Sequence, residues 1–174
     1  MKKIAIIGSS GSGKTTLAKK LATRLNLPLY HLDHYFWLPH WQEVSHEEFA
    51  QKQHELVKQD AWIIDGSFRR TLSIRLDAAD TIIFVDTSRL RCLYRVIKRQ
   101  IMHWGSNRPD MPIGCKTMFD KGFFKFLWDI WTWQTDGGRQ IIMDYLAQAN
   151  KTGSARVYHL KSPKEIDAFL ASLD

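Results

Sequence analysis

The chain has 174 residues and a mass of 20.3 kDa, the size of one domain that can bury a hydrophobic core. Its 44% apolar and 25% charged residues exclude a disordered chain, and its two cysteines, Cys92 and Cys115, exclude a disulfide scaffold and a structural zinc site. The 25 Lys and Arg residues against 18 Asp and Glu give a formal net charge of +7, which favours an anionic partner such as a nucleotide, a nucleic acid or an acidic membrane.

The pattern of apolar residues predicts short strands that alternate with helices. The first strand spans 3–7 and ends at Gly8, and the first helix spans 14–25. The later predicted elements are a strand at 29–32, a helix at 46–59 capped by Ser45 and Glu48, strands at 62–64 and 81–85, helices at 88–103 and 121–149, a strand at 155–160 and a helix at 163–173 capped by Ser162. The helix at 121–149 is expected to break at Gly137-Gly138. This order predicts an α/β protein whose five-stranded parallel sheet is covered by helices on both faces.

Three features bear on domain number and cellular location. No repeat or linker divides the chain, so residues 1–174 are expected to form one domain. The apolar run at 4–7 is shorter than the core of a secretory signal, and no segment approaches the ~18–20 apolar residues that span a bilayer. The two cysteines lack any pairing or metal-binding pattern, so we expect a reduced, cytoplasmic protein that does not associate with membranes.

A phosphate-binding motif follows the first strand. The segment Gly8-Ser-Ser-Gly-Ser-Gly-Lys-Thr15 matches the P-loop pattern GxxxxGK followed by Ser or Thr. Glycines let backbone N–H groups turn toward an anion, and the helix that follows adds its positive dipole end. The motif predicts the three-layer P-loop NTPase fold and an ATP site formed by Gly8, Ser9, Ser10, Gly11, Ser12, Gly13, Lys14, Thr15 and Thr16.

Carboxylates follow three later strands, where parallel sheets bind their ligands. Asp65 is expected to hold Mg²⁺ together with Thr15, or else to cap its own loop. Asp33 is predicted to bind the acceptor, as its ligand or its general base, with a loop cap as the alternative. Arg69 is predicted to face an anionic acceptor, or to be a surface charge. Asp86 is interpreted as a helix cap.

The predicted helix at 88–103 is basic, because no acidic residue lies between Thr87 and Pro109. Its four cations on one face are expected to point into the site, and its apolar face is expected to pack on the sheet. The basic face consists of Arg91, Arg95, Lys98 and Arg99, and the apolar face of Leu90, Leu93, Ile97 and Ile101. A solvated basic face and a nucleic-acid contact are the alternatives.

Residues 104–120 contain glycine and proline and are predicted to form a lid that delivers Arg108 to the transferring phosphoryl group. In the aromatic stretch that follows, Phe124, Trp128 and Trp131 share a helix face, which indicates core or a dimer interface, with base stacking as the alternative. Arg139 is expected to bind an ATP phosphate from the far side.

These motifs, in this order, resemble the adenylate-kinase-like nucleoside monophosphate kinases. The resemblance rests on the P-loop, on Asp65-Gly66-x-x-Arg69 and on Arg95-x-x-x-Arg99 followed by a lid. It implies that Asp65 acts on the magnesium side and that Arg69 binds the acceptor phosphate. It also implies that Arg95 and Arg99 bind phosphates of both substrates.

A closer resemblance, over about residues 3–145, is to the DNA topology modulation proteins, a bacterial group of small P-loop proteins related to adenylate kinase. The matching segments are His31-Leu32-Asp33, Trp62-Ile63-Ile64-Asp65-Gly66, Ser88-Arg89-Leu90, Arg95-Val96-Ile97-Lys98-Arg99 and Arg108-Pro109-Asp110-Met111. Ser67-Phe68 stands where adenylate kinases carry Phe-Pro, and neither a Thr-Gly-Asp-x-x-Arg segment nor a four-cysteine lid is present. These departures argue against AMP as the acceptor.

The sequence therefore predicts a kinase that transfers the γ-phosphoryl group of MgATP to a small acceptor. The arginine supply, with Arg70 and Arg75 added to those above, favours an anionic acceptor, and Asp33 keeps a hydroxyl acceptor open. The catalytic set is Lys14, Asp65, Arg95, Arg99 and Arg108, with ATP and Mg²⁺ as cofactors. A nucleotide-gated DNA-binding regulator and an NTPase whose acceptor is water are the alternatives, and a homo-oligomer is left open.

Overall fold

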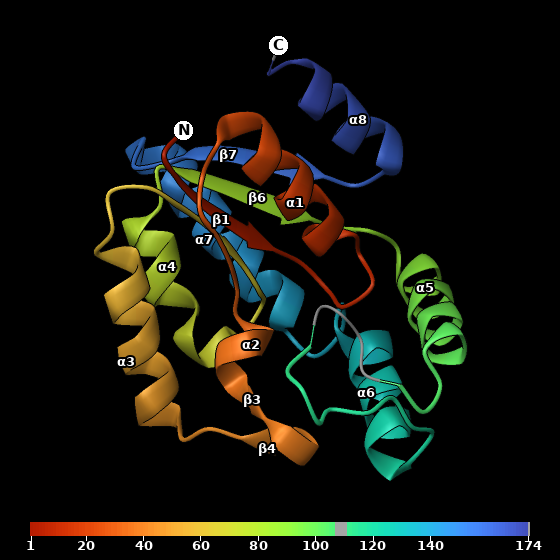
Figure 1. Cartoon of the computed structure of the whole chain (residues 1–174). Helices are drawn as coiled ribbons and strands as arrows, with labels where there is room; N and C mark the ends of the chain where they lie inside the picture. Colours follow the sequence, from red (N-terminus) through yellow and green to blue (C-terminus); the bar gives the residue numbers. More distant parts are fainter. Residues whose placement is uncertain (107–110, 174) are drawn as a thin grey trace.

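One parallel sheet of five strands, in the order β2-β5-β1-β6-β7, forms the centre of the protein in a computed structural model that describes residues 1–106 and 111–173 (Figure 1). The strands are β1 (Lys3–Ile7), β2 (Leu29–His31), β5 (Trp62–Asp65), β6 (Thr81–Val85) and β7 (Arg156–Leu160). Each neighbouring pair is parallel, and the register aligns Ile6 of β1 with Asp65 of β5 and with Ile83 of β6. All strands therefore end at the same edge of the sheet.

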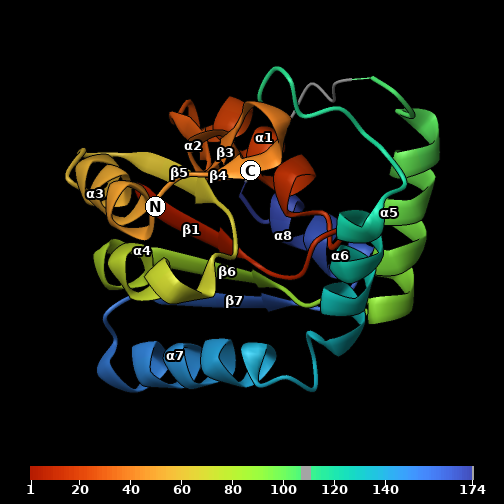
Figure 2. The same cartoon turned by 90° about the horizontal axis from the view of Figure 1, so that it is seen from below.

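Helices cover both faces of the sheet, because side chains of a strand alternate between its faces (Figure 2). In β1, Ala5 and Ile7 belong to one core cluster, whereas Ile4 and Ile6 belong to the other. The first cluster is closed by α3 (His46–Val57), α4 (Leu72–Ala78) and α7 (Gly138–Thr152), and the second by α1 (Lys14–Leu25) and α8 (Pro163–Ala171). The structure confirms the predicted three-layer P-loop fold.

Several helix ends are fixed by local signals that the sequence displays. The Ser45 hydroxyl accepts a hydrogen bond from the Glu48 N–H, and the Glu48 carboxylate accepts one from the Ser45 N–H, so the predicted capping box is present. Ser162 caps α8 in the same position, with Pro163 at the first turn. The predicted break at Gly137-Gly138 separates α7 from α6 (Lys121–Thr132).

Two segments at the ligand edge were not predicted. After β2 the chain forms α2 (Asp33–Phe36), the hairpin strands β3 (Trp37–Leu38) and β4 (Gln42–Glu43), and the 3-10 turn η1 (Pro39–Trp41) between them. After β5 it forms the 3-10 turn η2 (Arg69–Thr71), which leads into α4. Elements this short contain too few residues for their apolar side chains to show a helical or strand spacing.

The basic helix α5 (Arg89–Met102) is oriented differently from the prediction. Its buried residues are Cys92, Val96 and Gln100, and the first two pack with Phe123 and Ile130 of α6 in a third small cluster. The predicted sheet-facing residues Leu90, Ile97 and Ile101 are exposed instead. The expectation that this apolar stripe packs on the sheet is wrong, because α5 stands at the ligand edge and not on a sheet face (Figure 2).

Across the described parts of the chain, no helix combines the length and the apolar character needed to cross a bilayer.

Candidate active site

The P-loop joins β1 to α1 in a conformation that only its glycines permit. Gly8, Gly11 and Gly13 have φ angles of 146°, 81° and 106°. A Cβ on Gly8 would overlap the carbonyl oxygen of Val85, and one on Gly11 would overlap that of Cys92. The loop is therefore packed directly against the end of β6 and the start of α5.

Two side chains, one from the loop after β5 and one from α5, hold the P-loop in place. Ser67 accepts a hydrogen bond of 3.0 Å from the Gly8 N–H and donates one to the Gly8 carbonyl. The Arg95 guanidinium donates to the carbonyls of Gly11 and Ser12, at 3.3 and 3.0 Å. Arg95 thus acts on the shape of the loop, a role that the sequence did not indicate.

Lys14, the first residue of α1, lies under the P-loop. Its ammonium donates a 2.9 Å hydrogen bond to the Ser9 carbonyl. Burial lowers the pKa of Lys14 below its ordinary value, although the nearby Asp65 and Asp33 carboxylates act in the opposite direction. A polyphosphate would add negative charge at this position and favour the ammonium form.

Asp65, at the end of β5, is the most buried carboxylate at this edge, with 5% of its surface exposed. Its Oδ2 accepts a 2.7 Å hydrogen bond from the Thr15 hydroxyl and lies 3.1 Å from Nδ1 of His31. Its Oδ1 is buried and has no hydrogen-bond partner among the described residues, and the same holds for Oγ of Ser12. Buried oxygens without a hydrogen-bond partner are unusual in folded proteins. The Thr15 hydroxyl beside the Asp65 carboxylate is a set of oxygen ligands that suits Mg²⁺ and its water molecules.

Arg75 is fully buried and braces the turn after Asp65. Its guanidinium donates to the carbonyls of Gly66, Phe68 and Thr71 and to the side chain of Gln53, at 3.0 to 3.3 Å. Burial lowers the pKa of Arg75 to about 9, and the Asp65 carboxylate opposes that shift. The sequence predicts Arg75 as one of the arginines that favour an anionic acceptor. In the structure its N–H groups instead donate to protein atoms inside the fold.

Asp86 and Arg139 bind each other, contrary to both predictions. The residue at the N-cap position of α5 is Ser88, not Asp86. Asp86 instead accepts hydrogen bonds from the Arg139 guanidinium, at 2.8 to 3.3 Å. Its carboxylate also lies 2.8 Å from Nε2 of His159. Burial raises the pKa of Asp86, but the bonds from Arg139 and His159 outweigh it and lower the pKa. Arg139 is not among the residues that line the cavity, because Asp86 holds it at the base of α7.

Arg69 lines the cavity, and its charge is compensated. Its guanidinium pairs with Asp136 at 3.1 Å and sits over the ring of Trp133, 5.8 Å from the centroid. An acceptor anion would have to share Arg69 with Asp136.

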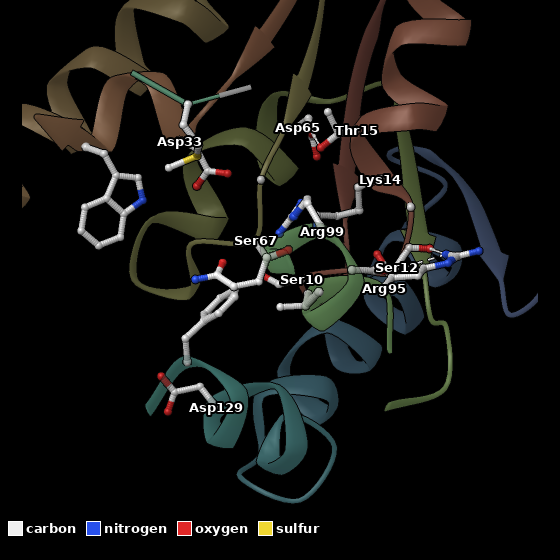
Figure 3. Close-up of a pocket in the computed structure, with 18 of the residues that line it drawn as sticks. Ser10, Ser12, Lys14, Thr15, Asp33, Asp65, Ser67, Arg95, Arg99 and Asp129 are labelled. Carbon is white, nitrogen blue, oxygen red and sulfur yellow. Dashed lines mark hydrogen bonds between the residues drawn. The ribbon is translucent and has the colours of Figure 1, made fainter. Parts of the chain in front are cut away.

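Most of the described residues predicted for the site line one cavity of about 1490 Å³ at the ligand edge. Figure 3 shows Lys14, Asp33 and Arg99 directed toward the same space, from α1, α2 and α5. The P-loop, Thr15, Thr16 and the start of α8 line one half. The other half is lined by Trp37, His40, Trp41, Glu43, Phe68, Met111, Lys116, Met118, Phe126 and Asp129. Arg108 lies outside the described residues.

The described part of the predicted lid is docked on the hairpin that follows β2. The Trp41 indole donates a 2.9 Å hydrogen bond to the Lys116 carbonyl, and the His40 N–H donates to the Gly114 carbonyl at 3.3 Å. His40 and Trp41 both have positive φ, 62° and 59°, an uncommon conformation that turns them toward this contact. The hairpin was missed because backbone conformations of this kind leave no sequence pattern at residues other than glycine.

No known protein family model matches the chain, and no curated protein matches its sequence. Its structure is similar to those of solved kinases. The shikimate kinase of Acinetobacter baumannii, solved with shikimate, is 15% identical at a TM-score of 0.51, and the comparison covers 99% of this chain and 90% of that one. The Aquifex aeolicus shikimate kinase is 17% identical (TM-score 0.53, covering 98% and 94%), and a Janibacter sugar kinase is 15% identical (TM-score 0.54, covering 100% and 95%). The likeness establishes the fold, which is that of the P-loop kinases.

Proposed function

We propose that the protein is an ATP-dependent phosphotransferase that phosphorylates a hydroxyl group of a small molecule. The observation that carries the proposal is the arrangement of Asp33 across one cavity from Lys14 and from the bonded pair Thr15 and Asp65. A phosphate-binding loop alone would serve any NTPase. A carboxylate on the opposite wall is what an alcohol acceptor needs as a general base.

The P-loop half of the cavity binds the nucleotide. Backbone N–H groups of residues 9–15 and the Lys14 ammonium contact the β- and γ-phosphates. Thr15 and Asp65 hold Mg²⁺ with its water ligands, and the ion neutralises phosphate charge when it is bound. The unpartnered oxygens of Ser12 and Asp65 support this assignment, because each gains a partner in the loaded site.

The acceptor binds in the other half, between α2, the hairpin and the lid. Its hydroxyl oxygen attacks the γ-phosphorus, its proton passes to Asp33, and ADP leaves. Lys14 and Arg99 stabilise the charge that develops on the phosphoryl oxygens. Aromatic side chains such as Trp37 and Trp41 supply flat apolar surface for the body of the acceptor.

The arginines on the acceptor side are fewer than the anionic acceptor predicted from the sequence would use, which favours an alcohol. Arg75 is turned into the protein, Arg70 does not line the cavity, and Arg69 is paired with Asp136. Asp33 and Glu43 add negative charge to the cavity, which offsets the ammonium of Lys116. The fold likeness to a sugar kinase and to a shikimate-bound kinase agrees, since both names refer to hydroxyl compounds.

Residues 104–120 act as the lid of this single domain, as the sequence predicts. The contacts of Lys116 and Gly114 with the hairpin support this role, because both residues also line the cavity. Closure excludes water, which would otherwise compete with the acceptor for the phosphoryl group.

The test is ADP release from MgATP with separate panels of sugars, other small alcohols, nucleoside monophosphates and carboxylates. We expect acceleration by a neutral or weakly charged alcohol. Lys14→Ala should abolish turnover while the fold is retained, and unchanged turnover in this variant would remove the phosphate role of Lys14.

Asp33→Asn separates the acceptor classes. With an alcohol acceptor we expect kcat to fall roughly 10²–10⁴-fold while the affinity for ATP is kept, because the amide cannot accept the proton. A phosphate acceptor is already an oxyanion, so a rate that survives Asp33→Asn would restore the anionic acceptor.

The same assays address the other sequence hypotheses. Turnover that no acceptor accelerates would favour an NTPase that uses water. The likeness to DNA topology modulation proteins motivates a nucleotide-gated DNA binder, for which DNA affinity should fall steeply with salt and change when ATP is added.

A further inference from the structure

The outer side of α5 carries a stripe of exposed apolar residues. Leu90, Tyr94, Ile97 and Ile101 are spaced by four, three and four residues, so they fall within about 60° of one another around the helix. Leu90 and Tyr94 are 68% and 64% exposed. Their spacing is that of residues at the seam between two packed helices, and nothing in the described chain covers them.

The neighbouring helix α6 carries a second exposed stripe, which like the first does not line the cavity. Phe124, Trp128 and Trp131 are spaced by four and three residues, and Trp128 is 65% exposed. The two helices lie side by side (Figure 2), with the small apolar cluster between them, and the Arg89 guanidinium stacks on the Trp131 ring at 4.0 Å.

This surface belongs to neither the core nor the active site. None of the seven residues lines the cavity, because Arg95 and Arg99 of α5 and Phe126 of α6 occupy the faces turned toward it. Aromatic side chains cover roughly 150–250 Å² each when buried, so the two stripes together expose several hundred Å² of apolar surface. Specific dimers bury about 800 Å² per partner, a comparable area.

We propose that the two stripes form the interface of a homodimer, in which α5 and α6 of one copy pack on α5 and α6 of a second copy related by a two-fold axis. A second copy offers the same paired ridges, the same aromatic residues and an arginine held against a tryptophan, a composition that protein interfaces favour. The proposal is independent of the reaction that the cavity performs.

The charges around the patch give the dimer a recognisable salt dependence. Arg91 and Lys98 of α5 and Lys121 of α6 are exposed beside the stripes, so the two copies bring like charges to the rim. Salt screens that repulsion: raising its concentration from about 0.1 M to about 1 M shortens the screening length from roughly 10 Å to roughly 3 Å. The dimer should therefore tighten in salt, whereas binding to an anionic membrane or to nucleic acid would weaken.

Sedimentation equilibrium at both salt concentrations tests the proposal. We expect a species of twice 20.3 kDa whose dissociation constant falls severalfold at high salt. Trp128→Ser, a change at an exposed position, should raise the dissociation constant about 30-fold or more, as at an interface hot spot, and Tyr94→Ser should also weaken the dimer.

Ile141→Ser on α7 is the matched control, because Ile141 is an exposed apolar residue (44%) away from the patch. It should leave the dissociation constant unchanged, and circular dichroism should show that all three variants fold. Three results would each overturn the proposal. They are a monomer at both salt concentrations, a dimer that dissociates at high salt, and a Trp128→Ser variant that dimerises as tightly as the wild type.

Discussion

Asp65 connects three segments that are distant in the sequence. Its Oδ2 contacts Thr15 of α1 and His31 of β2, and its backbone carbonyl accepts the Leu32 N–H at 2.9 Å. A single buried carboxylate thus aligns the nucleotide half of the cavity with the strand that leads to Asp33. Such a residue is hard to replace, because its loss would leave the neighbouring donors unpaired.

At the opposite end of the same edge, Asp86 provides a pH-dependent part of the stability. Because its folded pKa is lowered, the stabilisation is complete above the ordinary carboxyl pKa near 4 and is lost as pH falls through the folded value. We predict that Asp86→Asn lowers the free energy of unfolding by about 2 kcal/mol at neutral pH.

Urea denaturation at several pH values measures this effect. The difference between wild type and Asp86→Asn should begin to narrow below about pH 4, where the carboxyl of the unfolded chain takes up its proton, and should continue to narrow until the folded carboxyl is protonated as well. A difference that is constant with pH would mean that the charge of Asp86 contributes nothing.

Helix α5 illustrates how one element serves two sides of the molecule. Arg95 and Arg99 come from the face turned to the cavity, and the apolar stripe comes from the face turned outward. The two arginines nevertheless act differently, because Arg95 donates to the P-loop carbonyls of Gly11 and Ser12.

We predict that Arg95→Ala weakens ATP binding as well as kcat, because the P-loop loses a brace. Arg99→Ala should lower kcat roughly 10²-fold or more with a smaller effect on ATP affinity. Calorimetric ATP affinities and steady-state kinetics separate the two, and Arg91→Ala, an exposed cation on the same helix, serves as the control. Equal losses in affinity for both variants would contradict this division of roles.

The contact between hairpin and lid is a second effect at the scale of elements. Trp41→Phe removes the indole N–H that holds the Lys116 carbonyl but keeps an aromatic ring. We predict a higher KM for the acceptor and a nearly unchanged KM for ATP, with a stability loss of about 0.5–1.5 kcal/mol. Trp128→Phe is the control, because Trp128 lies outside the cavity, and it should change neither KM. Equal rises in both KM values for Trp41→Phe would argue against a lid contact that is specific to the acceptor.

For the whole molecule, the parallel sheet is what brings the site together. Its strand order places β1 in the centre, next to β5 and β6, so the P-loop, Asp65 and Asp86 emerge side by side. Ligand binding at this edge contacts several elements at once and should stabilise the entire fold.

We predict that MgATP at about 100 times its dissociation constant stabilises the protein by roughly 2.7 kcal/mol, or about 5–10 °C in Tm for a chain of this size. Calorimetric melting with and without MgATP measures the shift, and Lys14→Ala should remove most of it. An unchanged Tm for the wild type would mean that the P-loop does not bind the nucleotide.

Much of this protein could be predicted from local sequence signals. These signals are the P-loop, the capping box at Ser45, the N-cap at Ser162, the glycine break before α7 and the alternation of strands with helices. Each depends on residues within a few positions of each other. Local geometry and burial of apolar strands determine such features without reference to the rest of the chain.

The tertiary structure alone decided which residues meet across long separations. Arg75 turns into the protein, Asp86 binds Arg139 rather than capping α5, and the apolar face of α5 is exposed. A single sequence gives the charge of a segment and the spacing of its apolar residues. Which face of the helix points to the interior depends on the elements that pack against that helix. For α5 that neighbour is α6, and the face turned toward it is determined only when the chain has folded.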